Sequence, residues 1–337
     1  MAEYGTSLEK AIKSELFSWG ANSYRQLCCG HKKDVSLPEN VDASCYPENF
    51  VVAAIDGGGG HTAIITDNRE LFMCGWNNKG QLGLGDTENR QVLCHVQGLG
   101  CVKTVSCGWN HTLAVTADGS VWSWGANKKG QLGMGKTDGN CSTPQQVLFS
   151  DGQQITEVVA GAYHSAALTT SGQVFCWGSN QHGQCGRPPD AQSTEHQMFM
   201  TPQLIGGLLS SVTVTQVHTG WSHLLAVTED VRVFSWGRAD YGQLGLGDEV
   251  VQLSFCSEPA EVVLVRGANQ VLCGAEHNMA LLDSGSIRTW GWNEHGICGR
   301  ENETRNIHQP SVVYKLHDYI SSLIGCGGGH SFAVVKG

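Results

Sequence analysis

The chain has 337 residues, a formal net charge of −10 and a pI of about 5.7. This acidic balance, with no run of lysine and arginine, disfavours nucleic acid as the main partner. No apolar stretch approaches the roughly 18 residues of a membrane-spanning helix, and the N-terminus has no apolar signal core. We therefore expect a soluble, intracellular protein without a membrane span.

The chain begins with a segment that lies outside any repeat. Residues 1–15 are predicted to be an N-terminal extension, and residues 7–16 could form a short helix. The first predicted strand is LFSWG, which ends at Gly20. In the loop that follows, Arg25 and Cys28 stand where later copies have glycine, which weakens this loop because glycine adopts positive φ at the least cost.

One motif, Gly-x-x-His, then occurs six times along the chain. The intervals between successive histidines are 50, 53, 59, 54 and 53 residues. A period of this length indicates one multi-strand unit per repeat rather than a short helical repeat. The six glycine and histidine pairs are Gly58 and His61, Gly108 and His111, Gly161 and His164, Gly220 and His223, Gly274 and His277, and Gly327 and His330.

Each of the first five histidines is followed fourteen residues later by a second glycine. Between the two lie an apolar run such as TLAVT, a turn such as Ala117-Asp118-Gly119, and a second run such as VWSWG. Strand, glycine-bearing turn and strand are typical of a β-hairpin. The length is constant because a slip of one residue would move every side chain to the wrong face.

The segment after each second glycine completes the unit. It carries a tail related to N-x-x-G-Q-L-G, a polar loop and a further strand, and another strand leads back to the next histidine. About four strands per unit is the content of a β-propeller blade. We predict an all-β protein in which residues 1–337 form one closed propeller of six four-stranded blades. Pairing of the N-terminal strand ending at Gly20 with the C-terminal strand after His330 is expected to close the ring and remove its edges.

Two local matches to ligand-binding motifs are explained by the repeat. The segment Gly130–Thr137 fits the phosphate-binding loop G-x-x-x-x-G-K-T, but it is another copy of the tail and no helix follows it. The six histidines fall in six different blades, so they cannot form a compact metal site. We expect structural histidines that bond neighbouring backbone, and no metal, cofactor or catalytic residue.

The fourteen cysteines are scattered, and no C-x-x-C pair occurs among them. Buried cysteine thiols behave as small apolar side chains. Without a secretory signal, free thiols are favoured over a disulfide framework.

Residues that depart from the repeat are the best candidates for function. They could pack between blades, or they could form an exposed patch, because tryptophan, tyrosine and arginine dominate binding hot spots. Trp109 and Tyr163 could likewise pack between blades or belong to an exposed patch. The polar insertion 186–201 is either a surface loop without a function or a binding loop. The candidate partner-binding residues are Trp76, Arg187, Trp221, Arg238, Asp240, Tyr241, Trp292 and Glu294.

The repeat unit GWNHTLAVTADGSVWSWGANKKGQLGMG (108–135) resembles the repeats of the regulator of chromosome condensation family, and the resemblance covers essentially the whole chain. Segments such as LFSWGANSY, GGGGH (57–61), SWGRADYGQLG (235–245) and TWGWNEHG (289–296) are similar to a family member linked to secretion. The resemblance implies a propeller, and family members typically have seven blades, one more than the six counted here.

The resemblance also implies a function without covalent catalysis. It implies guanine nucleotide exchange on a small GTPase, a role in secretion through the exocyst, and a cytoplasmic and also nuclear location. The alternative is a non-catalytic scaffold that binds a secretory or GTPase complex. In either case the partner is a small GTPase or an exocyst-type complex, and the protein is expected to be a monomer.

Overall fold

The computed structural model describes residues 16–47, 50–137, 139–189, 197–300 and 305–336. The predicted extension 1–15, with most of its possible helix, therefore lies outside the described residues, as does segment 190–196 of the polar insertion. Within the described ranges, no helix has the length and apolar character needed to cross a membrane.

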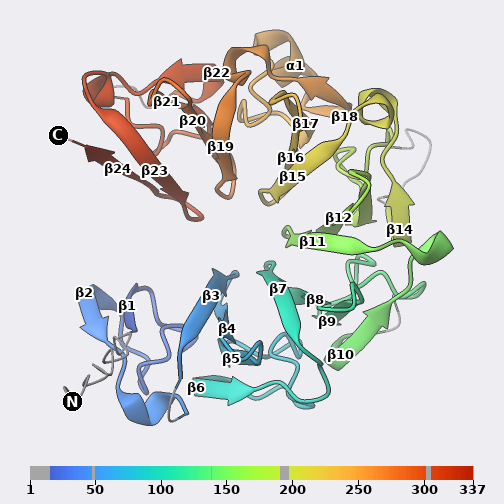
Figure 1. Cartoon of the computed structure of the whole chain (residues 1–337), viewed down its shortest axis with the longest axis vertical. Coiled ribbons are helices and arrows are strands. Elements are labelled where there is room, and N and C mark those ends of the chain that lie inside the picture. The colour runs from blue at the N-terminus through green and yellow to red at the C-terminus, as the bar shows by residue number, and fades with distance from the viewer. Residues whose placement is uncertain (1–15, 48–49, 138, 190–196, 301–304, 337) are drawn as a thin grey trace, which may run out of the picture.

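Five four-stranded antiparallel sheets, each a blade, surround a central axis (Figure 1). In each blade, strand order in the sheet follows strand order in the chain. The blades consist of β3 (Val52–Gly57), β4 (His61–Thr66), β5 (Leu71–Gly75) and β6 (Arg90–His95); β7 (Val102–Cys107), β8 (His111–Thr116), β9 (Val121–Gly125) and β10 (Cys141–Val147); β11 (Ile155–Ala160), β12 (His164–Thr169), β13 (Val174–Ser179) and β14 (Met198–Leu204); β15 (Val214–Thr219), β16 (His223–Thr228), β17 (Val233–Arg238) and β18 (Phe255–Glu261); and β19 (Ala268–Cys273), β20 (His277–Leu282), β21 (Ile287–Gly291) and β22 (Ile307–Val312).

The remaining strands form two smaller sheets at the ends of the chain. They are β1 (Phe17–Gly20) with β2 (Val35–Asn40), and β23 (Ile320–Cys326) with β24 (Ser331–Lys336). Helical structure in the described residues is limited to one short α-helix and five 3₁₀ turns, namely α1 (Asp248–Leu253), η1 (Ala43–Cys45), η2 (Ser150–Gly152), η3 (Gly207–Ser211), η4 (Val263–Val265) and η5 (Tyr314–Leu316). The all-β repeat of four-stranded blades is thus confirmed.

The predicted ring closure is wrong. Among the described strands, β1 pairs only with β2 and β24 only with β23, so the two terminal sheets lie on either side of an opening in the ring (Figure 1). The structure therefore contains seven sheets, five of four strands and two of two, instead of six complete blades. A chain with six repeats, one fewer than the resemblance led us to expect, leaves the circle incomplete.

The predicted hairpins are confirmed in all five complete blades. Each repeat histidine pairs directly with its second glycine, as His61 does with Gly75. Gly75 has φ of 102°, and a Cβ there would lie 2.5 Å from the carbonyl oxygen of Gly60. Glycine is required at this position for both reasons, which helps to keep the fourteen-residue spacing constant.

The repeat histidines connect each blade to the next. Their Nε2 atoms bond a side-chain oxygen of the following blade, rather than the backbone group expected from the sequence. The pairs are His61 with Thr112 (3.0 Å), His111 with Ser165 (2.9 Å), His164 with Thr219 (2.8 Å), His223 with Asn278 (2.8 Å) and His277 with Ser331 (3.1 Å). Among the described residues, the His330 ring makes no such bond, because the blade that would follow it lies across the opening.

The glycine three residues before each histidine allows blades to approach closely. A Cβ on Gly108 would lie 2.5 Å from both the carbonyl oxygen of Gly161 and the Cε1 atom of His111. The backbone at Gly108 does not have positive φ. Close approach, and not a left-handed conformation, therefore explains the glycine of the Gly-x-x-His motif.

The expectation that all cysteines are free thiols is wrong at one pair. Cys28 and Cys74 form a disulfide that joins the loop after β1 to strand β5. Cys28 has φ of 58° and Arg25 has φ of 72°. Both therefore keep the left-handed backbone of the glycines that they replace, at a cost of roughly 1 kcal/mol each for a residue with a Cβ.

Candidate functional site

The strand directions place two sets of loops at one end of the propeller. Because His61 pairs with Gly75, residues 58–60 and 76–89 leave the same end of the hairpin, and the turn at 67–70 lies at the other end. The other complete blades share this register. We call this end the loop face: it consists of the loops before each repeat histidine and the loops after each second glycine.

All eight predicted partner-binding residues lie on the loop face. Trp221 belongs to a loop before a repeat histidine, and the others follow a second glycine. This common location follows from the strand register and was not predicted from the sequence. The eight are Trp76, Arg187, Trp221, Arg238, Asp240, Tyr241, Trp292 and Glu294.

Aromatic side chains mark the centre and one side of this face. Trp221 is 43% exposed and meets Trp109 edge to face, with ring centroids 5.1 Å apart. Tyr163 is 47% exposed. Trp76 stacks on Tyr24, in the loop between β1 and β2, at a centroid distance of 4.4 Å. The aromatic residues therefore both pack against neighbouring side chains and remain partly exposed, so they are neither purely structural nor a purely exposed patch.

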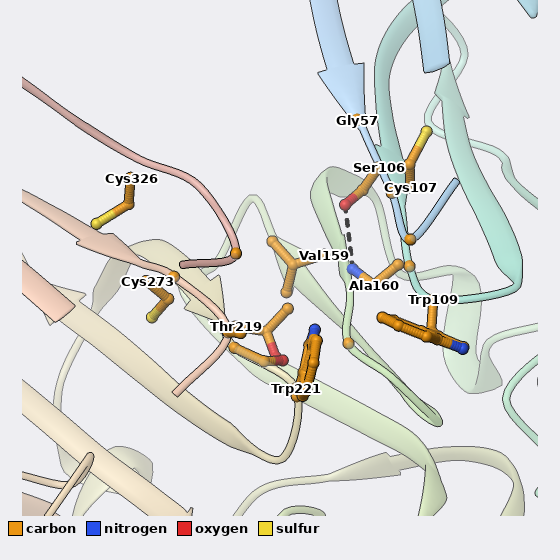
Figure 2. Close-up of a pocket in the computed structure, with 18 of the residues that line it drawn as sticks. Gly57, Ser106, Cys107, Trp109, Val159, Ala160, Thr219, Trp221, Cys273 and Cys326 are labelled. Atoms are coloured by element: carbon orange, nitrogen blue, oxygen red, sulfur yellow. Dashed lines mark hydrogen bonds between the residues drawn. The ribbon is translucent and has the colours of Figure 1, made fainter. Parts of the chain in front are cut away.

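A cavity of about 420 Å³ is lined by residues of all five complete blades and of β23, among them Trp109 and Trp221 (Figure 2). Its wall is formed by the loop-face ends of the innermost strands, which backbone hydrogen bonds connect from blade to blade. The Trp109 amide donates to the Gly161 carbonyl (3.2 Å), and the Trp221 amide donates to the Ala275 carbonyl (2.8 Å). Side-chain contacts add to this, as where the Ser106 hydroxyl accepts from the Ala160 amide (3.1 Å; Figure 2). The cavity thus has a rigid wall.

Ionisable groups near the axis have shifted pKa values. Burial raises the pKa of Asp56 to about 6, although its carboxylate accepts a hydrogen bond from the Cys107 amide at 2.6 Å. Burial also lowers the pKa of His218 to about 4. Desolvation therefore disfavours charge on both side chains.

Three of the predicted residues form a charged cluster around Glu276. The Arg238 guanidinium donates to the Asp240 carboxylate (2.8 Å), lies 3.5 Å from Glu276, and stands over the Tyr241 ring at 4.6 Å. The Gln243 amide donates to Glu276 at 2.7 Å. Burial raises the pKa of Glu276 to about 7, while Arg238 acts in the opposite direction.

Sequence reasoning missed Glu276, although a signal was present. It stands directly before His277, where the other repeats have Gly60, Asn110, Tyr163, Ser222 and Gly329. A carboxylate at this position occurs in one repeat alone, so it was itself a departure from the repeat.

Trp292 and Glu294 lie in an open pocket next to this cluster. The pocket has a volume of about 690 Å³, and Asp248 and His308 also line it. Those two side chains form a 2.6 Å pair that connects α1 to β22 of the next blade. The Trp292 amide donates to the Glu276 carbonyl at 2.8 Å, which links the pocket to the charged cluster. The structure therefore brings five of the eight predicted residues together.

The other three candidates lie elsewhere on the loop face. Trp76 packs on Tyr24 and Trp221 lies near the axis. Arg187 is exposed, and its guanidinium stands 5.4 Å from the Phe199 ring. Phe199 belongs to β14, so residues 198–201 of the predicted insertion form a strand, which corrects the prediction of a continuous surface loop.

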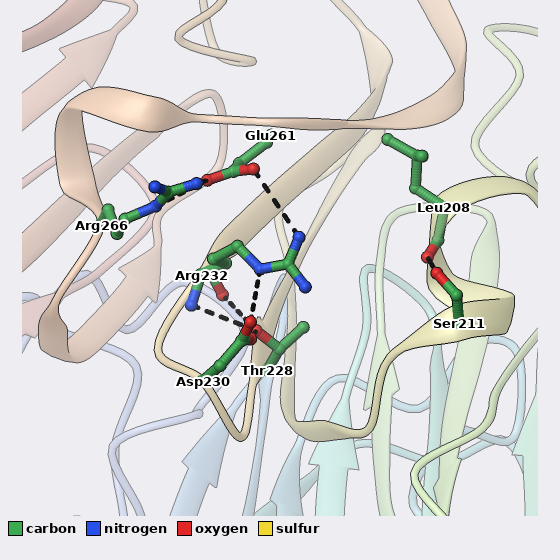
Figure 3. A network of polar contacts seen from close by, with 7 residues as sticks. All are labelled: Leu208, Ser211, Thr228, Asp230, Arg232, Glu261 and Arg266. Carbon is green, nitrogen blue, oxygen red and sulfur yellow. Dashed lines mark hydrogen bonds and ion pairs between the residues drawn. The ribbon is translucent and has the colours of Figure 1, made fainter.

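The opposite face offers a contrast (Figure 3). There the Arg232 guanidinium pairs with Asp230 at 2.7 Å and approaches Glu261 at 3.8 Å, and Arg266 also pairs with Glu261. These four charges compensate one another within a single blade, from the β16–β17 turn to the loop after β18. The buried carboxyl and the exposed aromatic cluster belong to the loop face.

Comparison with protein families gives a consistent result. The model described as RCC1-like domain matches residues 92–333, and the model described as regulator of chromosome condensation (RCC1) repeat matches residues 13–65 and 52–81. Among relatives, the chain is 36% identical to the mouse secretion-regulating guanine nucleotide exchange factor, across 95% of this chain and 83% of the relative. It is also 36% identical to mouse probable E3 ubiquitin-protein ligase HERC4, across 95% of this chain but 29% of the ligase.

Solved structures support the fold. Human WBSCR16 superimposes with a TM-score of 0.80 at 23% identity, covering 95% of this chain and 82% of that one. Prp20p from Saccharomyces cerevisiae gives 0.82 at 21% identity, covering 96% and 78%.

The alignment with the mouse exchange factor also shows a difference in length. It spans 402 positions, whereas 95% of this chain is about 320 residues. The relative therefore has additional aligned length greater than one repeat.

Proposed function

Because this chain belongs to the regulator of chromosome condensation (RCC1) repeat family, we propose that it is a guanine nucleotide exchange factor, or a related regulator, for a small GTPase. The observation that carries this proposal is the 36% identity to the mouse secretion-regulating guanine nucleotide exchange factor across 95% of the chain. By the same similarity, we propose a role in secretion, with an exocyst-type complex as a further partner and a cytoplasmic and nuclear location.

Exchange needs binding energy rather than covalent chemistry. A protein that binds the nucleotide-free GTPase more tightly than the loaded form weakens nucleotide affinity by the same factor, because the two equilibria are linked. The loop face supports this role, since it holds exposed aromatic rings on rigid blades and an arginine held by carboxylates. We propose that Tyr241, Arg238 and Trp292 contact the GTPase, with the Glu276 cluster holding the first two in place.

A second candidate function is a non-catalytic scaffold. The mouse HERC4 ligase contains a region 36% identical to this chain within a much longer protein, so these repeats also occur as one module among others. On this alternative, the loop face binds a GTPase or a secretory complex without accelerating nucleotide release.

Release of a fluorescent guanine nucleotide from a panel of small GTPases tests the two candidates. An exchange factor should accelerate release from at least one member, and the Tyr241→Ala variant should lose most of that acceleration. Leu148→Ala is the matched control, because Leu148 is 75% exposed on the opposite face. Binding without acceleration would favour the scaffold. Neither binding nor acceleration with any member would contradict the exchange factor and would leave only a scaffold for a secretory complex.

A further inference from the structure

The Cys28–Cys74 disulfide replaces a contact that holds the other blades together. In four blades a fully buried tryptophan precedes the second glycine, and its Nε1 donates to a carbonyl in the tail of the preceding blade. These bonds run from Trp124 to Gln81 (2.9 Å), Trp177 to Gln131 (2.9 Å), Trp236 to Gln184 (2.9 Å) and Trp290 to Gln243 (3.1 Å). Cys74 occupies the tryptophan position, and its sulfur lies 3.7 Å from the equivalent carbonyl, that of Gln26.

Cys28 occupies the matching position in the tail. Its equivalents are Gly83, Gly133, Gly186 and Gly245. A Cβ on Gly83 would lie 2.9 Å from the indole nitrogen of Trp124, so a tryptophan requires glycine opposite it. A cysteine at 28 therefore excludes a tryptophan at 74, and a small residue at 74 leaves room that a second sulfur fills. The two departures from the repeat occur at one contact and make sense only together.

The sheet that this bond secures is also attached to the first complete blade through an apolar cluster, in which Cys28 and Val41 pack with Ile64, Phe72 and Leu93. It is a two-stranded sheet, which is marginal in isolation. Phe17 is 46% and Trp19 51% exposed on its free edge. Besides the disulfide, its contacts with the first complete blade include the Gln26 carbonyl with the Thr62 hydroxyl (2.8 Å) and the Gly30 amide with the Gln91 carbonyl (3.2 Å).

We propose that the Cys28–Cys74 bond is a redox-dependent lock on the N-terminal sheet of β1 and β2. A dithiol, either a small molecule or a thioredoxin-type protein, reduces it: one thiolate attacks a sulfur, the S–S bond breaks, and the second thiol displaces the mixed disulfide. The dithiol is oxidised by two electrons, and its two protons end on Cys28 and Cys74. Glutathione disulfide restores the bond: one cysteine thiolate attacks it and releases one glutathione, and the second cysteine displaces the mixed disulfide and releases another.

The location of the sulfurs sets the order of events. Cys28 is 2% exposed and Cys74 is fully buried, so the N-terminal sheet must open locally before a reductant reaches either atom. Once reduced, the contact has neither the disulfide nor the tryptophan of the other blades. Tyr24 then leaves Trp76, which uncovers an aromatic ring of the loop face. This last consequence rests on the proposed function, whereas the lock itself does not.

Hydrogen exchange on the full chain, with and without dithiothreitol, tests the lock. The bond closes a 46-residue separation, so reduction should lower protection in residues 17–40 by roughly 10²-fold or more. Residues of β16 and β17 provide an internal reference that should not change. Alkylation and mass spectrometry establish the state of both sulfurs in each sample.

Two variants make the outcome decisive. Cys28→Gly with Cys74→Trp restores the contact of the other blades, so protection should be high and independent of dithiol. Cys28→Ser with Cys74→Ser should be poorly protected under both conditions, and it decides the question if the first variant does not fold. Free thiols at 28 and 74 in oxidised protein, or unchanged protection after verified reduction, would overturn the proposal.

Discussion

Trp236 and Trp19 occupy the same position in the repeat but have different surroundings. Trp236 lies in a complete blade, is fully buried, and bonds the tail of the blade before it. Trp19 lies in the N-terminal sheet beside the opening and is 51% exposed. The repeat therefore fixes where a side chain points, while its burial is supplied by the neighbouring blade.

The C-terminal sheet shows the same effect from the other side of the opening. Phe332 is 57% and Val334 53% exposed, whereas Leu225 and Val227 at the corresponding positions of β16 are buried. An apolar cavity of about 490 Å³ is lined both by Phe17 and Trp19 and by His330 and Phe332. The two terminal sheets thus present apolar edges toward one space without forming a common sheet.

Replacing a tryptophan by alanine should reduce the free energy of unfolding far more in a complete blade than in the N-terminal sheet. Trp236→Ala removes a fully buried indole and should lower the free energy of unfolding by about 3–5 kcal/mol. Trp19→Ala should cost less than about 1 kcal/mol, because half of that side chain is already exposed. Urea unfolding followed by circular dichroism measures both, and equal losses would show that the opening is closed in solution.

The repeat made most of the fold predictable, because its rules are local. The His61–Gly75 pairing follows from a fixed fourteen-residue hairpin, and the fourth strand of each blade follows from the tail. Ring closure was not predictable in the same way. Closure depends on how all the blades are oriented relative to one another, and no single residue determines that. A repeat count of six against the usual seven was the only indication.

The candidate site was predictable in part. Departures from the repeat singled out Arg238 and Trp292, which the structure places on the loop face, both next to Glu276. Glu276 and the disulfide were missed for a common reason: each matters through a partner in a neighbouring blade. Cys28 and Cys74 are 46 residues apart, and comparing equivalent positions in contacting blades would have revealed that both depart together.

Acidification should destabilise the complete blades, because each of them contains a buried repeat histidine. Burial lowers the pKa of His61, His223 and His277 to about 4, and that of His111 and His164 to about 3. The unfolded chain therefore binds more protons at these residues below about pH 6.5, and each should cost about 1.4 kcal/mol per pH unit as the pH falls toward 4.

Three carboxyls, of which Glu276 is buried and the other two are half-buried, act with the opposite sign. Burial raises the pKa of Asp56, Glu157 and Glu276, so the folded state holds their protons more tightly and gains stability on acidification. His218, whose pKa burial lowers to about 4, acts with the five repeat histidines, so six histidines outnumber the three carboxyls and stability should fall as the pH drops from 6.5 toward 4. Unfolding midpoints at several pH values measure the slope, and His111→Gln should reduce it by one histidine's share. A flat profile would contradict the buried, neutral histidines.

The smallest effect concerns the charged cluster, which joins one complete blade to the next. The Glu276 carboxyl has a pKa of about 7, raised by burial from its usual value of 4.5. Its stabilising effect is therefore greatest below about pH 4.5 and is lost as the pH rises through 7. Glu276→Gln keeps the shape and removes the titration, so its stability relative to the parent should rise by about 1.4 kcal/mol per pH unit between pH 5 and 6.5. Asp248→Asn is the control, because that carboxyl is 81% exposed and its loss should change stability by less than about 0.5 kcal/mol. If both variants behave alike, Glu276 is solvated in solution, and the loop face lacks the buried carboxyl that holds Arg238 in place.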